Sequence, residues 1–187
     1  MNKAHKGGLN PHYLGTCGDL RGLDLSDADL SGLDLSGSYL DGVNLEGAKL
    51  NGTKLISIKA RGTNFTKAHM NGADLTSSIL AGALFNSAQL NGANFNQASL
   101  SGAKIKEAEV SGTNFERSNL RGCFLESNLK TVVTKNASYS IGTKFSESLT
   151  PESKKLMTNA SLSASENSAS DDEDPFEKSN ERQPSSK

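Results

Sequence analysis

The sequence predicts a solenoid, a fold in which the chain winds in repeating coils around one narrow core. Two observations support this prediction. Every fifth residue from Leu20 to Leu125 is apolar, which makes 22 consecutive units without an interruption. Two residues before 18 of these 22 centres stands Ala, Ser, Thr, Gly or Cys. A period of five fits neither the period of about 3.6 of a helix nor the period of about 2 of a strand, so neither element could bury this pattern alone.

The composition excludes several other classes of protein. Only 34% of the 187 residues are hydrophobic and Trp is absent, so a conventional globular core would be thin. The net charge of −1 argues against a generally basic nucleic-acid binder. No apolar stretch is long enough for a membrane span or a cleavable signal, so we expect a cytoplasmic protein, or one translocated into a host cell. Two cysteines, Cys17 and Cys123, fit a reducing compartment.

The repeat unit resembles that of the pentapeptide-repeat family, which reads A(D/N)LXX. Three stretches match it closely: ADLSG at 28–32, ANFNQ at 93–97 and TNFER at 113–117. The resemblance extends over residues 18–127. It implies an all-β fold, a right-handed quadrilateral β-helix in which each apolar centre and the small residue two positions before it point inward. Each coil then takes four units, and the 22 units make about 5.5 coils.

Glycines mark the corners of the expected coil. Thirteen of the 18 glycines stand two residues after a centre, which is the third residue of a turn that starts at the centre. A type II turn needs a positive φ there, which glycine adopts without steric cost. From Gly62 onward this glycine comes only every ten residues. We therefore expect successive corners to alternate between a type II turn and a turn that needs no glycine.

The coil length also predicts how the aromatic residues are arranged. Residues 20 positions apart lie above one another in the four-sided coil that the resemblance implies. Phe65 should therefore stack on Phe85, and Phe95 on Phe115, at the opposite side of the core.

The pattern divides the chain into four parts. Residues 1–17 form an N-terminal segment or cap, and residues 18–127 form the β-helix. The repeat then slips by one residue, and residues 128–160 are predicted to form a degenerate last coil and a short helix capped by Thr150, which together cover the end of the solenoid. Residues 161–187 hold eight serines and seven acids, a composition typical of a disordered tail.

No residue pattern indicates catalysis. The three histidines are scattered and neither CxxC nor HExxH occurs, so we expect no metal site and no cofactor. Units of five residues leave no room for the loops on which active sites are usually built. The sequence therefore predicts a protein that is not an enzyme.

Function is expected on the outer surface or in the tail. Three apolar residues, Ile79, Leu84 and Phe124, stand at outward positions and form a candidate partner surface or a seam between two copies of the chain. In the tail, Asp174, Pro175 and Phe176 resemble motifs that clathrin-adaptor appendage domains bind, and the acidic, serine-rich context resembles the signals of type IV secretion substrates. These features favour a protein-binding scaffold that acts as a bacterial effector or adaptor, with a partner that the sequence does not name.

The resemblance also implies an alternative function: some members of the family protect DNA gyrase by mimicking duplex DNA. A mimic should present carboxylates all along its length, because duplex DNA carries one charge per about 1.7 Å of its axis. Residues 19–130 instead hold 12 acids and 11 bases, arranged in bands around the axis. Neither function implies direct binding of nucleic acid.

Overall fold

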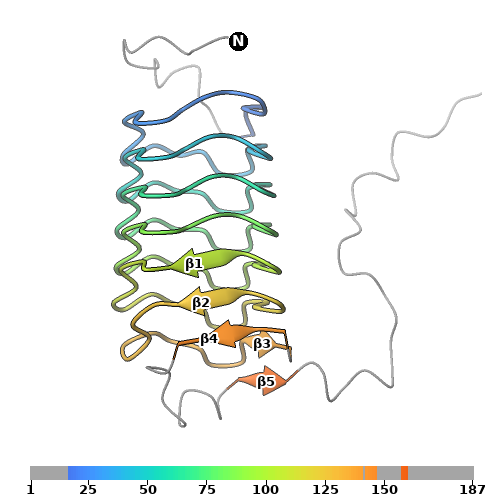
Figure 1. Cartoon of the computed structure of the whole chain (residues 1–187). Coiled ribbons are helices and arrows are strands. Elements are labelled where there is room, and N and C mark those ends of the chain that lie inside the picture. Colours follow the sequence, from blue (N-terminus) through green and yellow to red (C-terminus); the bar gives the residue numbers. More distant parts are fainter. Residues whose placement is uncertain (1–16, 141, 147–156, 160–187) are drawn as a thin grey trace, which may run out of the picture.

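The computed structural model describes residues 17–140, 142–146 and 157–159. In this part of the chain the coils stack into a rod, with the first repeats at one end (Figure 1). Parallel bridges join residues 20 positions apart in successive coils, from Asp19 with Tyr39 to Ser99 with Asn119. Each coil therefore consists of four five-residue units, as the resemblance implies.

The bridged residues stand one position before each centre, point outward and form four columns. We name the corresponding faces of the rod A to D in chain order. Face A carries Asp19, Tyr39, Lys59, Ile79, Ser99, Asn119 and Ser138. Face B carries Asp24, Asn44, Asn64, Leu84, Lys104, Phe124 and Lys144. Face C carries Asp29, Lys49, His69, Gln89 and Glu109, and face D carries Asp34, Lys54, Asp74, Asn94, Asn114 and Val133.

The bridges lengthen into short parallel strands toward the C-terminal end. On face B the strand order is β1, β2, β4, and on face A strand β3 pairs with β5 (Figure 1). The bounds are β1 Lys104–Lys106, β2 Phe124–Glu126, β3 Ser138–Tyr139, β4 Lys144–Phe145 and β5 Thr158–Asn159. The structure contains no helix within the residues it describes. The helix predicted after Thr150 and the tail predicted from residue 161 lie outside these residues.

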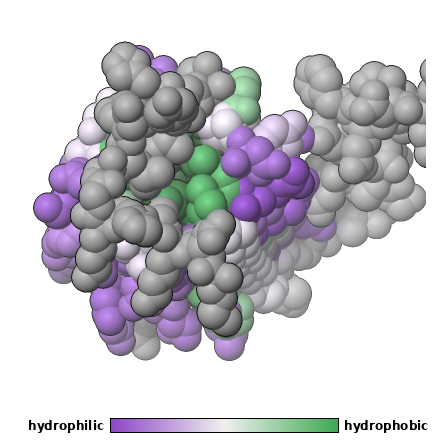
Figure 2. All heavy atoms as spheres, turned by 90° about the horizontal axis from the view of Figure 1, so that it is seen from above, coloured by the Kyte–Doolittle hydropathy of each residue, from purple (hydrophilic) through white to green (hydrophobic). Residues whose placement is uncertain are grey.

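The inward positions form the continuous core that the five-residue pattern predicts. Viewed along the axis, hydrophobic residues lie at the centre with hydrophilic residues around them (Figure 2). Phe65 and Phe85 stack with ring centroids 4.9 Å apart, and Phe95 and Phe115 with centroids 5.2 Å apart. Phe85 and Phe95 also meet edge to face at 5.6 Å. Both predicted stacks are confirmed.

The second inward position accepts a small hydroxyl as readily as a methyl group, because the hydroxyl finds a partner inside the core. The buried Thr63 Oγ1 donates to the carbonyl of Leu40 at 2.6 Å, and Ser78 Oγ donates to the carbonyl of Leu55 at 2.6 Å. Each acceptor belongs to a centre of the preceding coil. These bonds satisfy the buried hydroxyls, which would otherwise destabilise the core.

Successive corners share a positive φ at their third residue, whether or not that residue is glycine; the predicted alternation between two turn types stays a prediction. The thirteen corner glycines have φ values of 62° to 74°, and the corner residues that replace glycine have φ values of 55° to 60°. The residues in this second group are Asp27, Ser57, Lys67, Ser77, Ser87, Gln97, Glu107 and Arg117. Both kinds of corner make the same bond between coils: Gly62 N–H donates to the Ala81 carbonyl and Lys67 N–H to the Asn86 carbonyl, each at 2.9 Å. The ladder thus imposes the left-handed conformation, which costs a non-glycine residue roughly 1–2 kcal/mol.

The one-residue slip is absorbed within a single coil. On faces D and A the bridged partners are only 19 positions apart, as for Asn119 with Ser138. The spacing returns to 20 on face B, where Leu125 of β2 pairs with Phe145 of β4. The residue lost after position 125 is therefore regained between Tyr139 and Phe145, and the stacking continues. The domain boundary at residue 127 stays a prediction.

Candidate functional site

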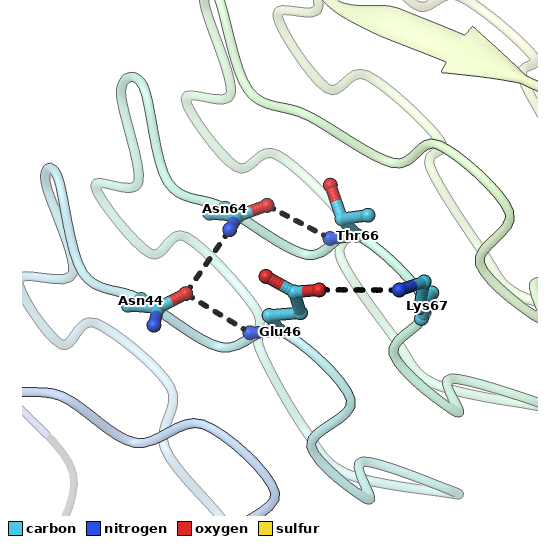
Figure 3. A network of polar contacts seen from close by, with 5 residues as sticks. All are labelled: Asn44, Glu46, Asn64, Thr66 and Lys67. Carbon is cyan, nitrogen blue, oxygen red and sulfur yellow. Dashed lines mark hydrogen bonds and ion pairs between the residues drawn. The ribbon is translucent and has the colours of Figure 1, made fainter.

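Many polar side chains on the rod bond to one another, which limits where a partner could be recognised. On face B, Asn44 Oδ1 accepts from Asn64 Nδ2 at 3.0 Å and from the Glu46 N–H at 3.3 Å (Figure 3). Asn64 Oδ1 accepts from the Thr66 N–H at 3.1 Å, and Lys67 Nζ lies 3.4 Å from Glu46 Oε1. This network fastens neighbouring coils together, so its groups have a structural role.

Faces C and D carry similar ladders. His69 Nδ1 and Gln89 Oε1 lie 2.9 Å apart on face C, and Asn114 Nδ2 donates to Asn94 Oδ1 at 3.1 Å on face D. The only histidine in the described ranges, His69, is thus a member of a ladder. Among the described residues, no group of three or more His, Cys, Asp or Glu side chains could hold a metal ion.

The acidic band of the first coil and the basic band of the second neutralise each other. Lys49 Nζ lies 3.8 Å from Asp29 Oδ2, and Lys54 Nζ lies 3.8 Å from Asp34 Oδ2. Arg61 and Lys67 pair in the same way with acids of the coil before them, Asp41 and Glu46. Exposed pairs of this kind add little stability. Their main effect here is to reduce the net charge that this half of the rod presents to a partner.

The carboxylates of the first coil are also hydrogen-bonded locally. Arg21 Nη2 lies 2.8 Å from Asp19 Oδ2, and the hydrogen bond that it donates lowers the pKa of Asp19 to about 2. The pKa of Asp29 is lowered by hydrogen bonds from Ser31, first from its side chain and then from its N–H. These aspartates therefore stabilise turns.

The structure brings the predicted apolar residues to two adjacent faces. Ile79 lies on face A, and Leu84 lies on face B just beyond the next corner, where it pairs with Lys104. Lys104 pairs in turn with Phe124, so Leu84 and Phe124 are two strand spacings, or about 10 Å, apart in one column. All three apolar side chains are half-buried.

Lysines alternate with these apolar residues along both columns. Lys144 Nζ lies 5.0 Å and Lys106 Nζ 5.4 Å from the centroid of the Phe124 ring, within the range of cation–π interactions. On face A, Lys59 Nζ lies 4.9 Å from the centroid of Tyr39, which is 36% exposed. We define the AB surface as Tyr39, Lys59 and Ile79 on face A and Leu84, Lys104, Phe124 and Lys144 on face B.

Sequence reasoning missed the tyrosine and the lysines of this surface. Tyr39, Lys59 and Ile79 are 20 positions apart, as are Lys104, Phe124 and Lys144. Writing the sequence in rows of 20 would have shown both columns. The predicted tail residues Asp174, Pro175 and Phe176 lie outside the described residues.

A second feature that sequence reasoning missed is a shallow hollow on face C. The bridges of this face end at Glu109, where the one-residue slip changes the register of the next coil. A hollow of about 390 Å³ opens beside it. Its lining consists of Asn91, Ala108, Glu109, Val110, Ser111, Asn128, Lys130 and Thr131. The signal for this hollow was the slip itself.

Comparison with known proteins identifies the family. A family model described as pentapeptide repeats matches residues 19–55, 48–82 and 83–122, which together make up more than half of the chain. The chain belongs to the pentapeptide-repeat family. The right-handed, four-sided β-helix expected from the resemblance is therefore its fold. No curated protein sequence matches the chain.

Several solved pentapeptide-repeat proteins are similar to this chain. HetL from the cyanobacterium Nostoc, involved in the regulation of heterocyst differentiation, is 24% identical with a TM-score of 0.37, over 68% of each chain. A protein from the Arabidopsis thaliana thylakoid lumen is 31% identical with a TM-score of 0.31, over 62% of this chain and 74% of that one. QnrB1, a plasmid-mediated fluoroquinolone resistance protein, is 17% identical with a TM-score of 0.43, over 76% of this chain and 86% of that one.

The described residues include no helix long and apolar enough to cross a membrane.

Both cysteines are free: Cys17 is exposed, whereas Cys123 occupies a buried inward position near the end of the rod, as its place in the repeat predicts. Burial raises the pKa of the Cys123 thiol to about 12, so this cysteine is a core residue without nucleophilic character.

Proposed function

We propose that this pentapeptide-repeat protein is a non-enzymatic scaffold that binds another protein through the AB surface. The observation that carries the proposal is the alternation of apolar side chains and lysines around one corner of the rod. Outward positions elsewhere are mostly occupied by polar groups that bond within the rod, such as Asn44 with Asn64 and His69 with Gln89. On the AB surface, exposed Tyr39 and half-buried Ile79, Leu84 and Phe124 lie on two adjacent faces, whereas exposed Val133 lies on face D.

The composition of the AB surface suits protein recognition. Aromatic and aliphatic anchors supply most of the binding energy in protein interfaces, and they act best when polar groups surround them and exclude water. Ile79, Leu84 and Phe124 can serve as anchors, and Lys104 and Lys144 as the polar surroundings. The ladder fixes the backbone beneath all of them, so no loop would have to be ordered on binding.

The pairing of charges favours this function over DNA mimicry. A mimic of duplex DNA needs carboxylates that are free to meet the cationic groove of its target. In the first coils, Asp29, Asp34, Asp41 and Glu46 each lie within 4.0 Å of a lysine or arginine of a neighbouring coil. Their fields are largely cancelled at the surface, which leaves little to imitate a phosphate backbone.

The proposal includes a role as a bacterial effector or adaptor. In this role the rod binds the partner protein. The acidic, serine-rich segment from residue 161 onward serves as the signal that a secretion system or an adaptor protein recognises. The motif at Asp174, Pro175 and Phe176 supports the adaptor role, and the many acids and serines support the secretion role.

The test is affinity capture with the full chain, followed by mass spectrometry. The test variant is Ile79→Ser with Leu84→Ser, and the matched control is His69→Ser with Gln89→Ser on face C. We expect a set of partner proteins that the wild type and the control retain and that the test variant loses, while circular dichroism shows all three chains folded.

Two other outcomes would contradict the proposal. An identical set of captured proteins for the test variant and the wild type would remove the AB surface from consideration. Capture of gyrase subunits that is insensitive to both variants would favour DNA mimicry. Light scattering on the same samples distinguishes a partner from a second copy, because a dimer seam would make the test variant half the mass of the wild type.

A further inference from the structure

We propose that residues 171–177 of this same chain bind the Phe124 end of the AB surface and so compete there with the protein partner. The segment reads Asp-Asp-Glu-Asp-Pro-Phe-Glu and carries five carboxylates around Phe176. Three observations support binding of the segment: the charge of the rod near Phe124, the apolar complementarity of the two phenylalanines, and the length of the linker between β5 and the segment. The competition, in addition, rests on the proposed function.

Charge is the first argument. Basic residues of the second and third coils have acidic partners: Lys49, Lys54, Arg61 and Lys67 are all in ion pairs. Toward the C-terminal end, no ion pair joins Lys104, Arg121, Lys130, Lys135 or Lys144 to an acid in the described part of the chain. Basic side chains that are not neutralised by neighbouring acids are therefore concentrated in the last coils. An acidic segment would be attracted to this end of the rod in preference to the middle.

Apolar complementarity is the second argument. Phe124 lies between Lys104 and Lys144 in its column, with Lys144 Nζ only 5.0 Å from the ring centroid. A carboxylate that reaches either ammonium group therefore lies beside an aromatic ring. In the segment, Phe176 likewise lies between carboxylates, with Asp174 before it and Glu177 after it. Contact between the two phenyl rings would place acids next to lysines, and aromatic pairs are worth about 0.5–1.5 kcal/mol beyond their burial.

The length of the linker between β5 and the segment is the third argument. Strand β5 ends at Asn159, and its partner β3 continues the column of Asn119 on face A. Phe124 is on the next face, five residues after Asn119, so it lies about two strand spacings, or roughly 10 Å, along the rod from β5. The 12 residues from Asn159 to Asp171 span up to about 40 Å. A linker of this length keeps the segment at millimolar effective concentration, so even weak binding would populate the contact.

The experiment is zero-length carbodiimide cross-linking of the dilute full chain, because this reagent joins carboxylates to lysines that they touch. We expect peptides that link residues 171–177 to Lys104 or Lys144 at least about tenfold more often than to Lys49 or Lys54, given the tethered concentration. Replacing the ring between the two lysines, Phe124→Ser, should reduce these links while both lysines remain, and the control Lys49→Ser with Lys54→Ser should leave them unchanged. Salt of about 1 M, where the screening length is about 3 Å, should reduce the links.

Three results would overturn the inference. One is an even spread of links over the lysines of the rod, and another is the absence of links when acetylation shows that Lys104 and Lys144 are accessible. In a mixture of isotope-labelled and unlabelled protein, links between the two forms would show that a second copy holds the segment. None of these results bears on the capture experiment above, so the proposed function and the present inference can fail separately.

Discussion

Replacement of Phe85 by alanine tests whether the stacked core holds the rod together. The Phe85 side chain is completely buried, stacks on Phe65 at 4.9 Å and meets Phe95 edge to face at 5.6 Å. Loss of a buried phenyl ring costs about 3–5 kcal/mol, less where the surroundings can collapse into the cavity. Here the backbone bonds on both sides resist collapse, since Phe85 N–H donates to the Lys104 carbonyl and Phe65 N–H to the Leu84 carbonyl, each at 2.7 Å. We therefore expect a loss near the upper end of that range.

The assay is urea unfolding of the full chain followed by circular dichroism, with Phe124→Ala as the matched control. The control makes the same chemical change at an outward position that is only half-buried. It should cost no more than about 1 kcal/mol, as is usual for substitutions near the surface. Equal losses for the two variants, or a loss below about 1.5 kcal/mol for Phe85→Ala, would refute the assignment of inward and outward positions.

Three further predictions concern the corners, acid stability and the cysteines. Gly82→Ala should lower the free energy of unfolding by about 1 kcal/mol because its φ is +68°, although a methyl group there meets no atom within 4 Å. Ser87→Gly should not lower it, because the left-handed strain that is relieved at φ +56° offsets the entropy that glycine loses on folding; thermal unfolding compares the two variants, and an equal loss for both would contradict the reasoning. Because the pKa of Asp19 is lowered to about 2, its small contribution to stability should be complete above about pH 4 and lost as the pH falls through 2; an NMR titration of the Asp19 carboxyl should give a midpoint near pH 2, and a midpoint near pH 4 would contradict the hydrogen bond from Arg21. Iodoacetamide should modify Cys17 in the folded protein and leave Cys123 intact, as measured by peptide mass; modification of both would contradict the burial of Cys123.

The repeat, its register and its core could be predicted from sequence because each five-residue unit makes the same choice of inward and outward residues. The stacks of Phe65 on Phe85 and of Phe95 on Phe115 follow from that register together with the four-unit coil that the family resemblance implies. The corner conformation could not be predicted in the same way. A residue such as Lys67 does not favour a positive φ by itself, and only the bond from its N–H to the next coil imposes one.

The C-terminal coil and the candidate site show what sequence reasoning missed. The slip after position 125 was noted, but its compensation was not, although Gly142–Phe145 (GTKF) repeats the pattern of Gly52–Leu55 (GTKL) and Phe145 stands 20 positions after Leu125. The apolar members of the AB surface could be found one at a time at outward positions. Lys104 and Lys144 stand 20 positions from Phe124 in the sequence, but the contacts of Lys106 and Lys144 with the ring became evident only in the structure.

The most direct test of the account is the affinity of the full chain for a captured partner, measured with purified proteins by calorimetry. The variant Leu84→Ser with Phe124→Ser removes two proposed anchors from face B, and His69→Ser with Gln89→Ser serves as the control on face C. If the AB surface binds the partner, the first variant should raise the dissociation constant at least about tenfold, which corresponds to about 1.4 kcal/mol, and the control should leave it unchanged. Equal dissociation constants for the wild type and the Leu84→Ser/Phe124→Ser variant, with both chains folded, would contradict the account.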